Sequence, residues 1–145
     1  EPAAFHLQDG YAVLASDWTG QTVTLELEMP VERVYAGPQV PHDAGLVCLQ
    51  RGPLVYCLEE VDNGKRLWNL SLPVDAALET NFEADLLEGV TVISATGYRR
   101  ADDDAGVLYR NNGRPVQVPV PLRFIPYYAW ANRAVGEMRV WIREC

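Results

Sequence analysis

The sequence predicts an all-β fold, an antiparallel β-sandwich with at most one short helix. Apolar and polar residues alternate with a period of two in several stretches, and glycine, proline and asparagine mark turns between them at short intervals. The chain has 145 residues, of which 48% are apolar and 22% are charged, which suffices for one buried core. We therefore expect residues 1–145 to form a single β-sandwich domain.

The first half of the chain contains the clearest strand signal. In residues 22–29 every second residue is apolar, which predicts a half-buried strand that ends at Pro30. Its inward residues would be Val23, Leu25, Leu27 and Met29. Further apolar runs predict strands over residues 11–16, 31–36, 46–50, 54–59 and 67–72. Gly52 and Pro53 separate two of these runs, and we expect a sharp turn with close backbone approach there.

The second half continues with strands and one helix candidate. Strands are predicted over residues 89–96, 116–120, 122–130 and 138–143, with residues 131–136 joining the last two as a hairpin. A short piece, residues 107–109, lies in a predicted exposed excursion. The helix candidate is residues 75–87, where Asp75 would cap a run that tolerates helix.

Charge and cysteine usage exclude several classes of partner. The net charge is −8, Lys65 is the single lysine, and the arginines are scattered, so we expect neither nucleic acid nor an anionic membrane as a partner. No apolar run is long enough to span a bilayer. The three cysteines, Cys48, Cys57 and Cys145, contain no closely spaced pair and favour a reducing, cytoplasmic location. The opening Glu1-Pro2, without a methionine, favours a processed chain or an excised fragment.

The residues that carry chemistry do not form a recognisable catalytic set. We expect His6 and His42 to be surface residues without a catalytic role, and no Gly-x-Ser-x-Gly motif is present. Glu59 and Glu60 are adjacent on a strand and point to opposite faces, so they cannot flank one glycosidic bond. We expect residues 102–104, which are all aspartates, to form a solvated loop rather than a catalytic pair. Cys48 and Cys57 with His42 are a candidate metal set, but cysteines in apolar strands usually pack as small hydrophobes. We expect no catalytic, cofactor-binding or metal-binding residue in this chain.

Aromatic residues and two arginines are the candidate contact residues. Tyr127, Trp130 and Trp141 lie in the predicted last hairpin, where exposed rings would suit a sugar or a neighbouring domain. Alternation would place Phe124, Tyr128 and Trp130 on one face and Tyr127 on the other. Arg51 and Arg133 could pair with carboxylates of another domain or anchor loops within the sandwich, and both alternatives stay open.

Three blocks of the sequence resemble the C-terminal region of glycoside hydrolase family 127, the β-L-arabinofuranosidases. They are Gly10-Tyr11 with Trp18 and residues 23–25, then GLVCLQRGPLVYCLE in residues 45–59, then PYYAWANR in residues 126–133 with GEMRVW in residues 136–141. The resemblance implies a parent in which an (α/α)6 barrel precedes β-sandwich material. It also implies that the barrel holds a zinc with cysteines and a glutamate and uses one cysteine as the nucleophile. No position of this chain matches that motif, so no zinc is assigned to Cys57 or any other residue here.

The resemblance leaves two hypotheses for function. The first is a non-catalytic accessory domain whose partner is its own catalytic barrel, with a homodimer as a further contact. The second is a carbohydrate-binding module that uses the aromatic residues to hold arabinose-containing glycans. Loss of sugar affinity on Trp130→Ala or Trp141→Ala would favour the second hypothesis.

Overall fold

The computed structural model describes residues 2–101, 109, 111 and 115–145. Strands dominate it, and the all-β class predicted from the sequence is confirmed. The strands are β1 (His6–Gln8), β2 (Tyr11–Val13), β3 (Val31–Val34), β4 (Leu46–Arg51), β5 (Leu54–Glu59), β6 (Leu70–Leu72), β7 (Glu79–Glu83), β8 (Val90–Arg100), β9 (Gln117–Pro126), β10 (Met138–Arg139) and β11 (Ile142–Glu144). The described helical elements are α1 (Glu60–Asn63) and three short 3₁₀ turns, η1 (Pro41–Asp43), η2 (Leu67–Asn69) and η3 (Tyr127–Ala129).

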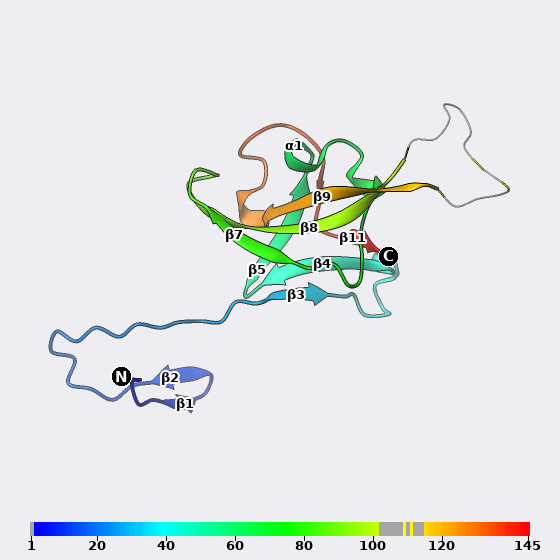
Figure 1. Ribbon diagram of the computed structural model, residues 1–145. Coiled ribbons are helices and arrows are strands. Elements are labelled where there is room, and N and C mark those ends of the chain that lie inside the picture. The colour runs from blue at the N-terminus through cyan, green and yellow to red at the C-terminus, as the bar shows by residue number, and fades with distance from the viewer. Residues whose placement is uncertain (1, 102–108, 110, 112–114) are drawn as a thin grey trace.

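Nine strands form one sheet that folds over on itself. The hydrogen-bonded order is β10-β5-β9-β8-β6-β11-β4-β3, with β7 added beside β8. Because β4 also pairs with β5, the path of strands closes, and the two layers face each other across the core (Figure 1). Among the described strands, β6 and β11 pair in parallel, and the other pairings are antiparallel.

From Tyr56 in β5 and from Phe124 in β9, both strands are buried on both faces, which explains the apolar residues there. Tyr56 and Leu58 of β5 lie in the main core, whereas Cys57 between them lies in a second, smaller cluster. Strand β9 divides in the same way, with Phe124 in the main core and Ile125 in the smaller cluster. The main core consists of Val47, Leu49, Tyr56, Leu58, Leu67, Leu70, Leu72, Ile93, Leu122, Phe124 and Ile142.

The prolines of β9 do not divide it, contrary to the prediction of separate strands over residues 116–120 and 122–130. Pro119 and Pro121 pair with Tyr98 and Thr96 of β8 in one continuous register. On its other side β9 pairs with β5 only from Phe124 onward, so that edge needs no amide donor at either proline. The strand ends at Pro126, and the chain then turns through η3.

Three further expectations are wrong. The helix candidate over residues 75–87 is instead β7, whose five residues pair with β8, because Thr80 and Phe82 suit a strand beside a long β8 edge. Residues 131–136 do not join a hairpin, since β10 pairs with β5 rather than with β9. The strand predicted over residues 22–29 is absent from the sandwich: the segment has no strand partner among the described residues, and Leu25 and Leu27 are exposed. The excursion at residues 107–109 lies mostly outside the described residues.

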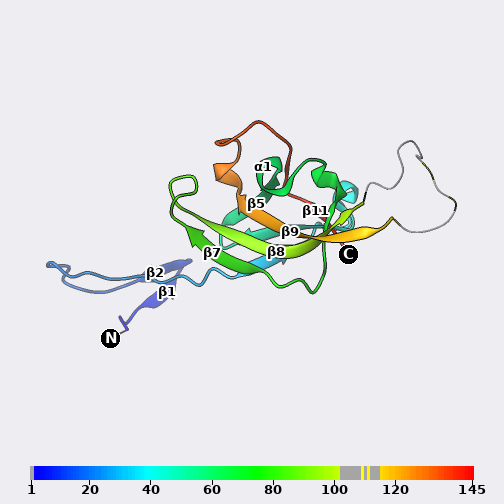
Figure 2. The same cartoon turned by 45° about the horizontal axis from the view of Figure 1, so that its top comes forward.

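The N-terminal part of the chain stands apart from the folded sheet. Strands β1 and β2 form a separate hairpin, and an extended segment connects it to β3. Figures 1 and 2 both show this hairpin and segment projecting away from the layers that enclose the core. The compact body therefore begins near β3.

A two-residue turn joins β4 to β5 at the position where the sequence predicts a sharp bend. Arg51 pairs with Leu54, which leaves Gly52 and Pro53 as the loop. Gly52 has a φ of +55°, the conformation that two-residue hairpins require at this place. A Cβ atom on Gly52 would lie 2.8 Å from Cε of Met29, so a side chain, rather than the expected backbone, lies close to this glycine.

Candidate functional site

The loop from Tyr127 to Glu137, here called the aromatic loop, presents three rings to solvent. The exposed fractions are 45% for Tyr127, 64% for Tyr128 and 40% for Trp130. The Tyr127 and Trp130 rings stack, with centroids 6.0 Å apart and planes inclined by 24°. Because the strand ends at Pro126 and η3 follows, Tyr127 and Trp130 lie together, and the predicted division of Tyr127 from Trp130 is wrong.

Buried charges hold the aromatic loop against β5 and α1. The guanidinium of Arg133 donates to Glu59 Oε2 at 2.5 Å and to Asp62 Oδ1 at 2.9 Å, and it also bonds Asp62 Oδ2. The Glu59 and Asp62 side chains are only 4% and 6% exposed. The hydrogen bond with Asp62, then that with Glu59, raises the pKa of Arg133 above its ordinary value, so this arginine stays charged.

A second arginine extends this charge network to β7. Arg123 of β9 lies 3.4 Å from Asp62 Oδ1 and also pairs with Glu83. Asn63, at the end of α1, adds two uncharged hydrogen bonds. Its side-chain Nδ2 donates to the backbone carbonyl of Arg123 at 2.9 Å, and its Oδ1 accepts from the backbone N–H of Arg123 at 2.9 Å. The network thus ties the aromatic loop to β5, α1, β9 and β7.

Backbone contacts complete the anchoring. The Ala131 amide donates to Glu59 Oε1 at 3.0 Å, and Ala131 adopts a φ of +65°, unusual for a residue with a side chain. At the other end, Glu137 and Glu60 exchange two bonds: Glu60 N donates to Glu137 O at 2.9 Å, and Glu137 N donates to Glu60 Oε2 at 3.0 Å. The aromatic loop is therefore an ordered surface.

A pocket of about 550 Å³ lies beside the aromatic loop. Leu87, Glu88, Tyr128, Ala129 and Asn132 line it. A ring face, a carboxylate and an amide are the groups that a neutral sugar would use for stacking and hydrogen bonding. The amide of Asn132 already donates to the carbonyls of Ala129 and Trp130, which leaves its oxygen as an acceptor.

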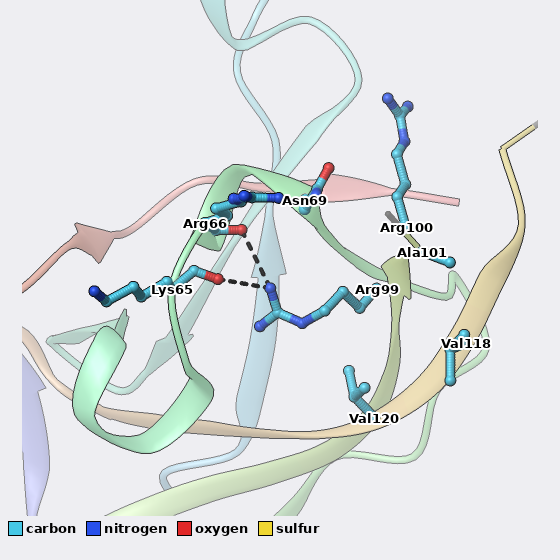
Figure 3. A pocket seen from close by; sticks show the side chains of 8 residues that line it. All are labelled: Lys65, Arg66, Asn69, Arg99, Arg100, Ala101, Val118 and Val120. Atoms are coloured by element: carbon cyan, nitrogen blue, oxygen red, sulfur yellow. Dashed lines mark hydrogen bonds between the residues drawn. The ribbon is translucent and has the colours of Figure 1, made fainter. Parts of the chain in front are cut away.

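A second pocket gathers positive charge that the sequence shows as scattered. Lys65, Arg66, Arg99 and Arg100 line it together with Asn69, Ala101, Val118 and Val120 (Figure 3). The Arg99 guanidinium donates to the carbonyls of Lys65 at 2.7 Å, Arg66 at 3.4 Å and Asn63 at 2.5 Å. Arg99 therefore anchors the loop between α1 and η2. Sequence reasoning missed this cluster because the four cations come from two distant segments.

The remaining candidate residues occupy different places. Arg51 ends β4, half-buried, and its Nε has no hydrogen-bond partner among the described residues. Trp141 is half-buried between β10 and β11. The carboxylate partners of Arg133 lie within the chain. Contact of Arg51, Tyr127, Trp130, Arg133 or Trp141 with another domain or a sugar stays a prediction.

Two of the three cysteines lie in the interior, where their thiols are kept from water. Cys48 and Cys57 are buried, and burial raises the pKa of the Cys48 thiol to about 11 and of the Cys57 thiol to about 12. Such thiols stay protonated at neutral pH, unlike zinc-binding thiolates. In the part of the chain that the structure describes, no three His, Cys, Asp or Glu side chains gather into a possible metal site. Nor does any described helix have the length and apolar character needed to cross a membrane.

Comparisons with known proteins agree on one family. The sequence profile of the glycoside hydrolase family 127 C-terminal domain matches residues 31–143. A non-reducing end β-L-arabinofuranosidase from Bifidobacterium longum is 45% identical over 99% of this chain and 23% of its own length. A crystal structure of a family 127 β-L-arabinofuranosidase from Geobacillus stearothermophilus T6 is 58% identical, with a TM-score of 0.77 over 81% of this chain and 18% of that one.

A further solved structure, a family 127 β-arabinofuranosidase, is 30% identical with a TM-score of 0.82 and covers 99% of this chain and 22% of its own. The chain thus spans about a fifth of the length of these relatives. The chain belongs to glycoside hydrolase family 127, of which it carries the C-terminal domain.

Proposed function

We propose that this chain is a non-catalytic domain that docks, through its aromatic loop, on the catalytic part of a β-L-arabinofuranosidase-like enzyme. The relatives that match it have names that state this activity, and the chain spans only about a fifth of each. One observation carries the docking role: three exposed rings stand on a loop that buried ion pairs hold in place. Aromatic residues are enriched in protein interfaces, and an ordered apolar surface binds at low entropic cost.

Tyr128→Ala tests this role, because the Tyr128 ring is exposed and stacks on no other ring among the described residues. In the 145-residue chain alone, the variant should change the free energy of unfolding by less than about 0.5 kcal/mol. In the full-length polypeptide that carries this chain, it should lower the melting temperature of the catalytic part and its hydrolysis of an aryl β-L-arabinofuranoside after heating.

Trp68→Ala is the matched control. Trp68 is also an exposed aromatic residue, at 57%, but lies on η2 outside the aromatic loop. We expect it to leave the full-length enzyme unchanged. Equal effects of Tyr128→Ala and Trp68→Ala on the full-length enzyme would refute docking through the aromatic loop.

The pocket beside Tyr128 supports a second candidate, a carbohydrate-binding module for arabinose-containing glycans. Its lining combines a ring, the Glu88 carboxylate and the Asn132 amide. Titration of the 145-residue chain with arabino-oligosaccharides, followed by calorimetry, separates the two roles. A dissociation constant below roughly 1 mM that is lost in Tyr128→Ala would favour the binding module.

A further inference from the structure

Residues 22–29 form an extended segment with alternating apolar residues and no strand partner in the described part of the chain. Leu25 and Leu27 are 74% and 71% exposed, and Val23 is exposed as well. The residues between them are Thr24, Glu26 and, at the end, Glu28. One face of the segment is thus apolar and the other suits water, which is the pattern of a strand at the surface of a sheet.

We propose that residues 22–29 add as a strand to the open edge of a sheet that belongs to the polypeptide preceding this chain. The inference rests on the proposed function, since it requires a longer enzyme. A sheet edge offers unpaired amides and carbonyls, and the sheet face would cover the apolar side chains. Strand addition therefore satisfies both the backbone and the apolar face of this segment.

The comparisons indicate on which side of the domain boundary the segment belongs. The C-terminal domain profile begins at residue 31, directly after Pro30. Relatives nevertheless match nearly the whole chain, at 99% coverage for both the Bifidobacterium enzyme and one solved structure. Residues 22–29 are thus part of the family's sequence yet lie outside its C-terminal domain, which favours a partner elsewhere in the same polypeptide over a second copy of the sandwich.

The hairpin that precedes this segment also exposes apolar side chains. The hairpin of β1 and β2 exposes Phe5, Leu7 and Tyr11, at 61%, 75% and 75%. Figures 1 and 2 show it on the same side of the molecule as the extended segment, away from the core. Apolar residues thus continue along the chain toward the part of the polypeptide that the relatives have in addition.

The C-terminal end of the segment is fixed to the sandwich. Met29 is half-buried, and its side chain lies against the turn between β4 and β5, with Cε 2.8 Å from the position that a Cβ atom on Gly52 would take. A sheet that captured residues 22–29 would consequently lie next to this turn. The segment would then join two β units, with Met29 in contact with the second.

Hydrogen–deuterium exchange followed by mass spectrometry tests the proposal in the 145-residue chain and in the full-length polypeptide. Amides of residues 22–29 should exchange at nearly the rate of unstructured peptide in the chain alone and at least about 100-fold more slowly in the full-length polypeptide. Fast exchange in both would overturn the proposal. Protection already present in the chain alone would also overturn it, and protection that rises with concentration would indicate a second copy instead.

Paired variants of the full-length polypeptide test which face is covered. Replacing Leu25 and Leu27 together by serine should reduce the protection at least about tenfold, whereas replacing Thr24 and Glu26 together by serine should not. Equal loss in the two double variants would contradict burial of the apolar face. The aromatic loop gives its own peptides in the same experiment: if these are protected and residues 22–29 are not, this inference fails while the proposed docking role stands.

Discussion

Replacing Arg133 by alanine removes the cation between two buried carboxylates. Glu59 and Asp62 would remain with side chains that are 4% and 6% exposed, so water cannot replace the guanidinium without opening the aromatic loop. Breaking a buried ion pair from one side usually costs about 3–5 kcal/mol, because the remaining charge is left uncompensated. We therefore expect Arg133→Ala to lower the free energy of unfolding markedly.

The remaining contacts place the expected cost at the lower end of that range. Glu59 keeps the Ala131 amide at 3.0 Å, and Asp62 keeps Arg123 at 3.4 Å. We therefore expect Arg133→Ala to lower the free energy of unfolding by about 3 kcal/mol. At about 3 °C per kcal/mol for a domain of this size, the melting temperature should fall by roughly 9 °C.

Urea unfolding followed by tryptophan fluorescence measures this cost, with Arg143→Ala as the matched control. Arg143 is exposed on β11, and its removal should cost less than about 0.5 kcal/mol. In the double variant Arg133→Ala with Glu59→Gln, one of the two unpaired carboxylates loses its charge. Its loss in free energy of unfolding should therefore be smaller, by at least about 1 kcal/mol, than the sum of the losses of the two single variants. If Arg133→Ala costs no more than Arg143→Ala, the ion pairs do not hold the aromatic loop in place.

Three further predictions concern acid stability, thiol reactivity and packing. Hydrogen bonds from the backbone amides of Leu67 and Arg66 lower the pKa of Glu137 from its ordinary value of 4.5. The carboxylate of Glu137 therefore stabilises the fold above pH 4.5, and this stabilisation is lost as the pH falls through the lower folded pKa. Glu137→Gln should make the free energy of unfolding decline less steeply with acid, as measured by urea unfolding between about pH 3 and pH 6. In the folded chain at pH 8, Ellman's reagent should react quickly with the exposed Cys145 only, and rapid reaction of all three thiols would contradict burial of the other two. Gly97→Ala should cost at least about 2 kcal/mol, since its Cβ would lie 2.5 Å from the Ser71 carbonyl oxygen, whereas Gly37→Ala, which meets only a flexible glutamine side chain, should be nearly neutral in thermal unfolding.

The strands that the sequence predicts best are those buried in the body. Strand β5 has the predicted bounds, residues 54–59, because a dense apolar run between a Gly-Pro turn and charged residues leaves little choice of register. The helix expected over residues 75–87 shows the limit of local propensity. The residues of β7 are compatible with either state, and the neighbouring edge of β8, distant in sequence, decides for strand.

The sequence predicts which residues belong to the candidate site, but it does not predict how they are arranged in space. The sequence singles out Tyr127, Trp130 and Arg133, and the structure gathers them in one loop. The sequence cannot show that the period-two pattern stops at Pro126, so that the Tyr127 and Trp130 rings stack instead of alternating. Nor does it show that Glu59 pairs with Arg133, because 74 residues separate them and nothing local links the two.

The Glu59–Arg133 ion pair connects the two sequence blocks on which the family resemblance rests. RGPLVYCLE ends at Glu59 and PYYAWANR ends at Arg133, and these last residues meet at 2.5 Å. Between them the blocks supply the strand that is buried on both faces, the exposed rings and the charges that fix one to the other. A buried pair of this kind adds little net stability over apolar packing, but it specifies one geometry. The blocks thus encode the orientation of an aromatic surface relative to β5, which is what a domain that docks in one register requires.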